Sequence, residues 1–325
     1  MLRVVLIAIL VLLAVAAVWL FEGDIPAAEV DARYSNAASR FLTTPDGARL
    51  HYRDQGRRDG LPVVLVHGSN ASLHTWEPWV AALGDGYRII TLDLPGHGLT
   101  GRVPGDDYGP QASSAAVHEV VEHLGLTRFV LGGNSMGGGV TWRYALDHPQ
   151  SVRAMILVDA SGLWSWRRQE TSRTGDTPLA FELLRQPWFR ALARYLDPYY
   201  LTVQGLRAAY NDSPVVDEAL IQRYYQLSLR EGTRIATLKR FGGFAGATQD
   251  AEPDLSVLTQ PTLILWGARD TLIGPEVGQR FHELLPNSQL IVYDDLGHVP
   301  MEEDPVRTAR DVRSFLAGLQ AQGSG

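Results

Sequence analysis

The chain of 325 residues contains no cysteine, which excludes disulfides, thiolate metal sites and a cysteine nucleophile. Basic residues are also scarce, because 29 Lys and Arg stand against 36 Asp and Glu, for a formal net charge of -7. Without a positive field to attract a phosphate backbone, nucleic acid is not expected as a partner. No residues have convincing metal-ligand spacing and no dinucleotide-binding motif stands in a suitable context. The sequence therefore predicts neither a metal nor a cofactor.

One long apolar run is present near the N-terminus, where residues 4–21 (VVLIAILVLLAVAAVWLF) carry no charge. As a helix this run would be about 27 Å long, close to the roughly 30 Å thickness of a hydrocarbon core. No clean cleavage site follows it, although Ala14-Val15-Ala16 inside the run is a weak candidate. We therefore expect a membrane anchor at residues 1–22, with a removed secretion signal as the alternative. Arg3 precedes the run and acidic residues follow it, so the remainder is expected outside the cytoplasm.

The sequence beyond the anchor predicts an α/β fold. Residues 23–41 are polar and rich in alanine, as expected for a tether, and residues 48–53 alternate like an early antiparallel strand. Helical patterns separate several of the apolar runs that follow, so we expect a doubly wound, mostly parallel sheet. The runs that read as strands buried on both faces are residues 62–66, 87–92, 128–131, 154–158, 262–266 and 289–293.

The alternation of strand and helix is interrupted once. Residues 162–254 contain no strong strand pattern and are rich in Trp, Tyr, Phe, Leu and Arg at helical spacing. This predicts a helical cap inserted between the two parts of the α/β core, residues 42–161 and 255–325. Most of the aromatic side chains are expected to pack the cap helices, and some of them to line an apolar pocket.

Ser135 is the candidate nucleophile. It stands at the centre of Gly133-Asn134-Ser135-Met136-Gly137, where an apolar strand pattern turns directly into a helical one. Such a sharp turn needs tiny residues two positions before and after the serine, because neighbouring backbone packs against them. The following helix points its first N–H groups at charge that develops on the substrate, so the Met136 amide is the expected first oxyanion donor. A phosphate-binding loop is disfavoured, because no Lys-Ser or Lys-Thr follows the glycines.

The base and its acid are expected at the carboxyl ends of later strands. His298 follows the last strand pattern and is the best general base among nine histidines. Asp270 follows residues 262–266 and could orient the imidazole, although a turn or helix-capping role is also possible for it. Asp159, which ends residues 154–158, is the rival acid, because a carboxylate one strand earlier can reach the same histidine.

The loop after residues 62–66 should supply the second oxyanion donor. Gly68 allows the backbone to turn inward, and the amide of Ser69 is the first choice, with Asn70 next. His67 is expected to pack and to form hydrogen bonds, not to act as a base. Residues 93–98 (DLPGHG) are expected to form a rigid supporting loop at the same edge.

These motifs closely resemble the α/β-hydrolase superfamily from about residue 41 to the C-terminus. The resemblance rests on His67-Gly68, residues 93–98, the turn around Ser135, residues 266–270 (WGARD) and Gly297-His298. It implies the fold and a triad of Ser135, His298 and Asp270. The chain looks most like capped bacterial esterases and the carbon–carbon bond hydrolases of aromatic degradation. Haloalkane dehalogenases and epoxide hydrolases resemble it elsewhere but use aspartate at the position of Ser135, so those activities are not expected.

The expected function is that of a serine esterase or lipase that cleaves carboxylic esters through an acyl-enzyme. The aromatic cap and the anchor favour a lipophilic small-molecule ester delivered near a membrane. Two alternatives remain open. One is carbon–carbon bond hydrolysis with the same triad, and the other is a ligand-binding member of the fold with little turnover.

Overall fold

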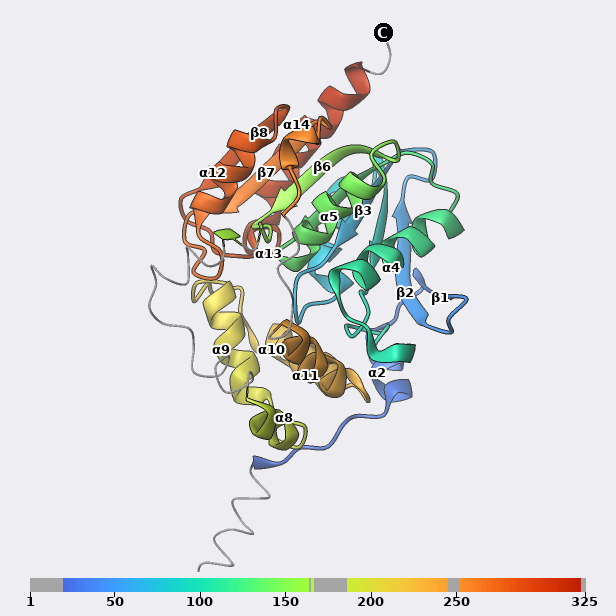
Figure 1. The fold of residues 1–325 in the computed structure, drawn as a ribbon, viewed down its shortest axis with the longest axis vertical. Helices are drawn as coiled ribbons and strands as arrows, with labels where there is room; N and C mark the ends of the chain where they lie inside the picture. The colour runs from blue at the N-terminus through green and yellow to red at the C-terminus, as the bar shows by residue number, and fades with distance from the viewer. Residues whose placement is uncertain (1–19, 164, 167–185, 245–251, 323–325) are drawn as a thin grey trace, which may run out of the picture.

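A central sheet of eight strands organises the molecule (Figure 1). The computed structural model describes residues 20–163, 165–166, 186–244 and 252–322. The order of strands across the sheet is β1-β2-β4-β3-β5-β6-β7-β8, and the pairs from β4 to β8 are parallel, whereas β1–β2 and β2–β4 are antiparallel. The predicted mostly parallel sheet is confirmed, including its early antiparallel strand. The strands are β1 (Ser39–Thr43), β2 (Arg49–Gly56), β3 (Leu61–Val66), β4 (Tyr87–Leu92), β5 (Phe129–Asn134), β6 (Val152–Val158), β7 (Thr262–Gly267) and β8 (Ser288–Tyr293).

Helices cover both faces of the sheet, which explains why its central strands are apolar along their whole length. In β3, Val64 and Val66 pack into the cluster that contains side chains of α4 (Pro110–His123), α5 (Met136–Asp147) and α12 (Pro275–Leu284). Val63 and Leu65 point to the other face, where the cluster contains side chains of α3 (Glu77–Leu83) and α14 (Pro305–Gln322). Successive side chains of one strand therefore serve two separate apolar layers.

Two sequence expectations need correction at the margins of the sheet. Residues 289–293 were expected to be buried on both faces, but β8 is an edge strand and is half-exposed. The segment 23–41 contains helix α2 (Ala27–Tyr34) and the start of β1. Both were missed because α2 buries only Val30 and β1 has no fully buried residue. The contacts of these elements with later parts of the chain, which sequence patterning does not reveal, hold them in place.

Residues 162–254 lie between β6 and β7 and are called the helical insertion; residues 164, 167–185 and 245–251 lie outside the described part. The described residues of the insertion form four helices. They are α8 (Pro187–Ala193), α9 (Tyr199–Ala209), α10 (Glu218–Leu229) and α11 (Thr233–Phe244), drawn in yellow to orange in Figure 1. The insertion contacts the carboxyl ends of the strands. The carbonyl of Ala209 in α9 accepts a hydrogen bond from the backbone N–H of His298 at 2.8 Å.

No helix among the described residues is both long and apolar enough to cross a bilayer. The apolar run at residues 4–21 lies outside the described residues except for Leu20 and Phe21. The expected anchor therefore remains a prediction from the sequence.

Candidate active site

Ser135 lies at a strained turn between β5 and α5. Its backbone has φ 53° and ψ -119°, a conformation that L-residues rarely adopt and that accumulates at functional sites. The neighbouring glycines are sterically required. A Cβ on Gly133 would overlap the backbone of Gly137, and a Cβ on Gly137 would overlap the carbonyl oxygen of Val66. The predicted need for tiny residues on both sides of Ser135 is thus a consequence of backbone packed against backbone.

The loop after β3 packs directly against this turn. A Cβ built on Gly68 would lie 3.1 Å from the Cβ of Ser135 and 2.8 Å from the side-chain oxygen of Asn134. Ser69, the next residue, is exposed, and Met136 is the first residue of α5, so its N–H is among those a helix leaves without an intrahelical partner. The two residues expected to supply oxyanion donors therefore flank Ser135 from two different elements.

His298 and Asp270 form a buried hydrogen-bonded pair at the carboxyl ends of the strands, where Ser135 also lies. The imidazole Nδ1 lies 2.6 Å from Asp270 Oδ2, and both side chains are almost completely buried. The other carboxylate oxygen of Asp270 accepts hydrogen bonds from the backbone N–H groups of Leu272 at 2.8 Å and Ile273 at 3.0 Å. The carboxylate is therefore fixed on both sides, and the Nε2 atom is left as the ring nitrogen that can face Ser135.

Asp159, the rival acid, lies beside this pair but makes different contacts. Its Oδ1 accepts a hydrogen bond from the Gly267 N–H at 2.9 Å, whereas the buried Oδ2 has no partner among the described residues. Polar atoms of Asp159, Asp270 and His298 lie within 4.8 Å of one another. Burial, together with the charge of Asp270, raises the pKa of Asp159 well above its usual range. Asp159 is therefore the carboxyl group whose neutral form is favoured, and Asp270 is the one bonded to the imidazole.

The same three side chains are close enough together to ligate a metal ion. Their chemistry fits a hydrogen-bonded cluster better. Burial favours the neutral form of Asp159, which is a poor metal ligand, and His298 Nδ1 is already bonded to Asp270. The arrangement is compatible with a base and an acid that orients it.

Two residues that the sequence patterns did not single out hold the His298 loop. The side-chain amide of Asn134 donates hydrogen bonds to the carbonyl of His298 at 2.9 Å and to that of Val158 at 3.2 Å. The Glu303 carboxylate accepts from the backbone N–H groups on either side of His298, those of Gly297 at 2.9 Å and Val299 at 3.2 Å. Burial raises the pKa of Glu303. Neither residue carries a sequence signal, because the partners are backbone groups brought together only by the fold.

His67 and residues 93–98 are structural, in agreement with expectation. His67 Nδ1 donates to the Gly68 carbonyl at 2.7 Å, and its Nε2 accepts from the Leu94 N–H at 3.0 Å, so the ring is neutral and burial lowers its pKa. Burial alone would raise the pKa of Asp93, but a 2.7 Å hydrogen bond to His51 holds that pKa well below its usual range. This network braces the loop that carries Gly68.

Arg240 of α11 connects the helical insertion to the loop after β3. Its guanidinium is buried and donates hydrogen bonds to the Asn70 side chain and the His97 ring. Because burial disfavours the charged form, the pKa of Arg240 falls to about 10. Sequence reasoning missed this contact, since nothing near residue 240 distinguishes it from a surface arginine of a helix.

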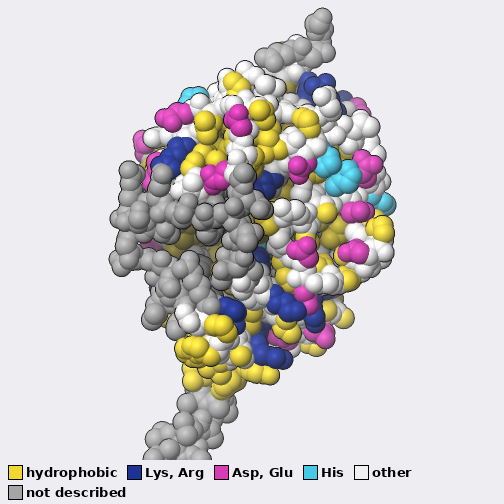
Figure 2. All heavy atoms as spheres, viewed as in Figure 1, with side chains coloured by type: hydrophobic (Ala, Val, Ile, Leu, Met, Phe, Trp, Pro, Cys, Tyr) yellow, Lys and Arg dark blue, Asp and Glu magenta, His cyan; other side chains and the backbone are white. Residues whose placement is uncertain are grey.

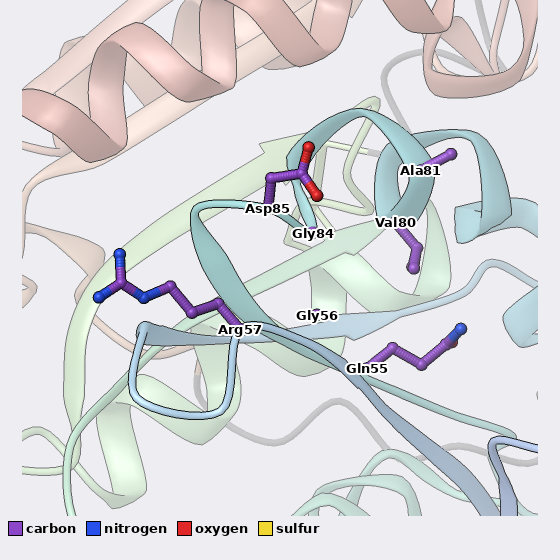
Figure 3. Close-up of a pocket in the computed structure, with 7 residues that line it drawn as sticks. All are labelled: Gln55, Gly56, Arg57, Val80, Ala81, Gly84 and Asp85. Carbon is purple, nitrogen blue, oxygen red and sulfur yellow. The ribbon is translucent and has the colours of Figure 1, made fainter.

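A hollow of about 550 Å³ lies elsewhere on the molecule (Figure 3). It is lined by Gly56 and Gly84 beside the amino ends of β3 and β4, whereas Ser135 follows the carboxyl end of β5. The side chains of Gln55, Arg57 and Asp85 point in different directions and do not converge. This hollow therefore has no set of polar groups aimed at a ligand. The candidate site lies instead at the carboxyl ends of the strands, where Ser135 is found.

Comparison with known proteins agrees with this geometry. The family described as alpha/beta hydrolase fold matches residues 62–305. Lipase 1 of Psychrobacter immobilis is 27% identical over 297 residues, which cover 89% of this chain and 87% of the lipase. The 2-hydroxy-6-oxo-2,4-heptadienoate hydrolase of Pseudomonas putida is 30% identical over 289 residues, covering 87% of this chain and 98% of that enzyme.

Among solved structures, that of a membrane phospholipase A, a bacterial virulence factor, is similar with a TM-score of 0.71 and 26% identity, and the match covers 98% of this chain and 99% of that one. The resemblance inferred from the sequence motifs is thereby confirmed. The chain belongs to the α/β hydrolase fold family and is a hydrolase of that fold.

Proposed function

We propose that the protein is a serine hydrolase that cleaves carboxylic esters through an acyl-enzyme. The observation that carries the proposal is the placement of a strained, half-buried Ser135 at the sheet edge where His298 is bonded to Asp270 at 2.6 Å. A nucleophile, a base and an acid that orients the base are the minimum for acyl transfer by serine.

Each group has a defined role in the proposed reaction. Asp270 holds Nδ1 protonated, so Nε2 of His298 accepts the Ser135 proton while the serine oxygen attacks the ester carbonyl. The amides of Met136 and Ser69 stabilise the negative charge that forms on the carbonyl oxygen. His298 then protonates the leaving alcohol, which leaves Ser135 acylated. In the second half, His298 deprotonates a water molecule that attacks the acyl-enzyme, and then returns this proton to the Ser135 oxygen as the bond to the acyl group breaks and the acid product is released.

A lipophilic ester is the proposed substrate class. The similarity to a lipase and to a membrane phospholipase A supports it, as does the aromatic-rich insertion, which we propose forms a cap over Ser135. We also propose that residues 1–22 remain as a membrane anchor with the catalytic part outside the cytoplasm. The uncharged run at 4–21 supports the anchor, and so does the near-complete coverage of the membrane phospholipase by this chain.

A carbon–carbon bond hydrolase is the second candidate, favoured by the 30% identity to the Pseudomonas putida hydrolase. The same triad would serve both reactions, so the site does not separate them. Assays of both substrate types side by side would separate them. We expect turnover of p-nitrophenyl esters to exceed that of a vinylogous diketone by orders of magnitude, and the reverse ranking would favour the second candidate.

The decisive test replaces Ser135 in the full chain in detergent. Ser135→Ala should lower p-nitrophenyl butyrate hydrolysis by about 10³-fold or more, because the nucleophile is lost. Its melting temperature should stay at the wild-type value, since the serine hydroxyl is not part of the packed core. A fluorophosphonate probe should label the wild type and leave Ser135→Ala unlabelled. Undiminished hydrolysis by the variant would refute the assignment, and a wild type that takes no label would indicate a ligand-binding member with little turnover.

A further inference from the structure

Helix α8 presents an apolar stripe to solvent. Trp188, Ala191, Leu192 and Tyr195, at positions i, i+3, i+4 and i+7 of α8 and the turn after it, are all exposed. This spacing places them on one helix face. In a surface helix of a globular protein such a face normally packs on the core, but here it points away from it. The helix therefore has an apolar face that no described part of the chain covers.

The stripe is part of a larger apolar surface at one end of the molecule. Asp197 donates from its backbone N–H to the Leu20 carbonyl at 2.8 Å, and Glu22 donates to the Tyr195 carbonyl at 3.1 Å, so the first described residues lie beside α8. Figure 2 shows hydrophobic side chains gathered at this end, with basic ones near them. We call this surface the apolar end; its large side chains, exposed between 42% and 70%, are Leu20, Phe21, Trp188, Leu192, Tyr195, Tyr200 and Leu201.

The position of the N-terminal segment indicates what covers the apolar end. The uncharged run of residues 4–21 finishes at Phe21, inside this surface. The chain just after the run is fastened to the insertion, because Arg234 donates to the Glu22 carbonyl at 2.9 Å and pairs with Asp24 at 3.1 Å. A bilayer that contains the run must therefore have its surface at Phe21, and α8 then lies at the same level.

The composition of α8 fits the boundary between lipid and water. Residues 186–196 contain Trp188, Tyr195 and two arginines, and no acidic residue. Trp and Tyr concentrate at this boundary, and arginines favour anionic headgroups while their stems lie on apolar surface. The Arg194 guanidinium already lies 4.7 Å from the centre of the Tyr195 ring. The apolar face would thus enter the acyl region while the charged groups stay among the headgroups.

We infer that the apolar end is a membrane-docking surface, seated in the outer boundary of the same bilayer that holds the N-terminal anchor. The inference rests on the anchor in the proposed function and goes beyond it, because it makes the helical insertion a lipid-contacting part. The catalytic domain would then be held against the bilayer at two places, the anchor and α8, with a fixed orientation.

The absence of cysteine allows a direct test in the full chain. Single variants Trp188→Cys and Leu192→Cys carry an NBD fluorophore, and Val306→Cys, an exposed position at the start of α14, is the matched control. The proteins are reconstituted in phosphatidylcholine–phosphatidylglycerol vesicles, with flotation to show insertion of the anchor. Shallow doxyl-labelled lipid should quench the labels at 188 and 192 and leave that at 306 unaffected. If the labels at 188 and 192 were not quenched in protein that floats with the vesicles, the inference would be overturned. The same would hold if the labels were covered only by a second copy of the chain and not by lipid.

A second measurement separates docking from catalysis. Trp188→Asp combined with Leu192→Asp should lower hydrolysis of a vesicle-borne lipid ester on the order of tenfold, because the docked orientation is lost. Hydrolysis of soluble p-nitrophenyl butyrate should stay unchanged, and Val306→Asp should change neither rate. Equal loss on both substrates would contradict docking. If the wild type cleaved no ester at all, the proposed function would fail. The quenching experiment would still show whether the apolar end contacts lipid.

Discussion

Replacement of Asp159 and Asp270 by asparagine, one at a time, tests which buried carboxyl group is ionised. Asparagine at 159 keeps an acceptor for the Gly267 N–H, now 2.9 Å from Asp159 Oδ1, and is uncharged like the neutral form of the carboxyl group. Because burial and the charge of Asp270 favour the neutral form of Asp159, Asp159→Asn should change kcat/KM by about threefold at most, which is roughly 0.7 kcal/mol. Asparagine at 270 removes the charge that orients His298 and stabilises the imidazolium. The expected loss is about 10³- to 10⁴-fold, or roughly 4 to 5.5 kcal/mol.

The same pair of variants predicts a pH-dependent difference in stability. The pKa of Asp159 is raised on folding, so the stability it contributes is fully present below its unfolded pKa and is lost as the pH rises toward the folded value. Asp159→Asn has no such group. Its free energy of unfolding relative to wild type should therefore increase from pH 5 to pH 8, with a slope of at most about 1.4 kcal/mol per pH unit. Each kcal/mol corresponds to about 2 to 4 °C in melting temperature.

The assays are initial rates on p-nitrophenyl butyrate and thermal unfolding between pH 5 and pH 8, on the full chain in detergent. Asp270→Asn is the matched control, since it makes the same chemical change one strand away. If Asp159→Asn lost as much activity as Asp270→Asn, or if its relative stability fell with rising pH, Asp159 would be the ionised acid and the reasoning from burial would be wrong.

Other substitutions test the backbone packing and the hydrogen bonds around the site. Gly137→Ala should cost about 3 kcal/mol or more in unfolding free energy, because its Cβ would overlap the Val66 carbonyl oxygen. Gly205→Ala, in α9 with open space around it, should stabilise by up to about 1 kcal/mol, and equal melting temperatures for the two would contradict the packing argument. Glu303→Gln should lower kcat on a soluble ester about tenfold with little change in KM, because one of the two oxygens that accept from the N–H groups beside His298 becomes an NH2 donor. A change in KM alone would show that Glu303 acts on substrate binding.

The sequence was most informative where the chemistry is local. The turn at Ser135 is specified by glycines within two residues of it, and the central strands are apolar throughout because each serves two layers. Sequence order favoured Asp270 but left Asp159 open, because both follow neighbouring parallel strands and only side-chain direction separates them. The roles of Glu303 and Arg240 depend on partners that the fold brings together.

If the apolar end docks on a bilayer, helix α9 would be a spacer between the lipid and the candidate site. Its first turn carries Tyr200 of the apolar end, and its last residue, Ala209, accepts the hydrogen bond from the His298 N–H. Eleven helical residues span about 16 Å, so with a bilayer at the apolar end the imidazole stands about three helical turns above the headgroups. A lipid would have to be lifted by that length out of its leaflet before its ester met Ser135. The length of this one helix would then select for acyl chains long enough to bridge the gap while still partly held by the bilayer.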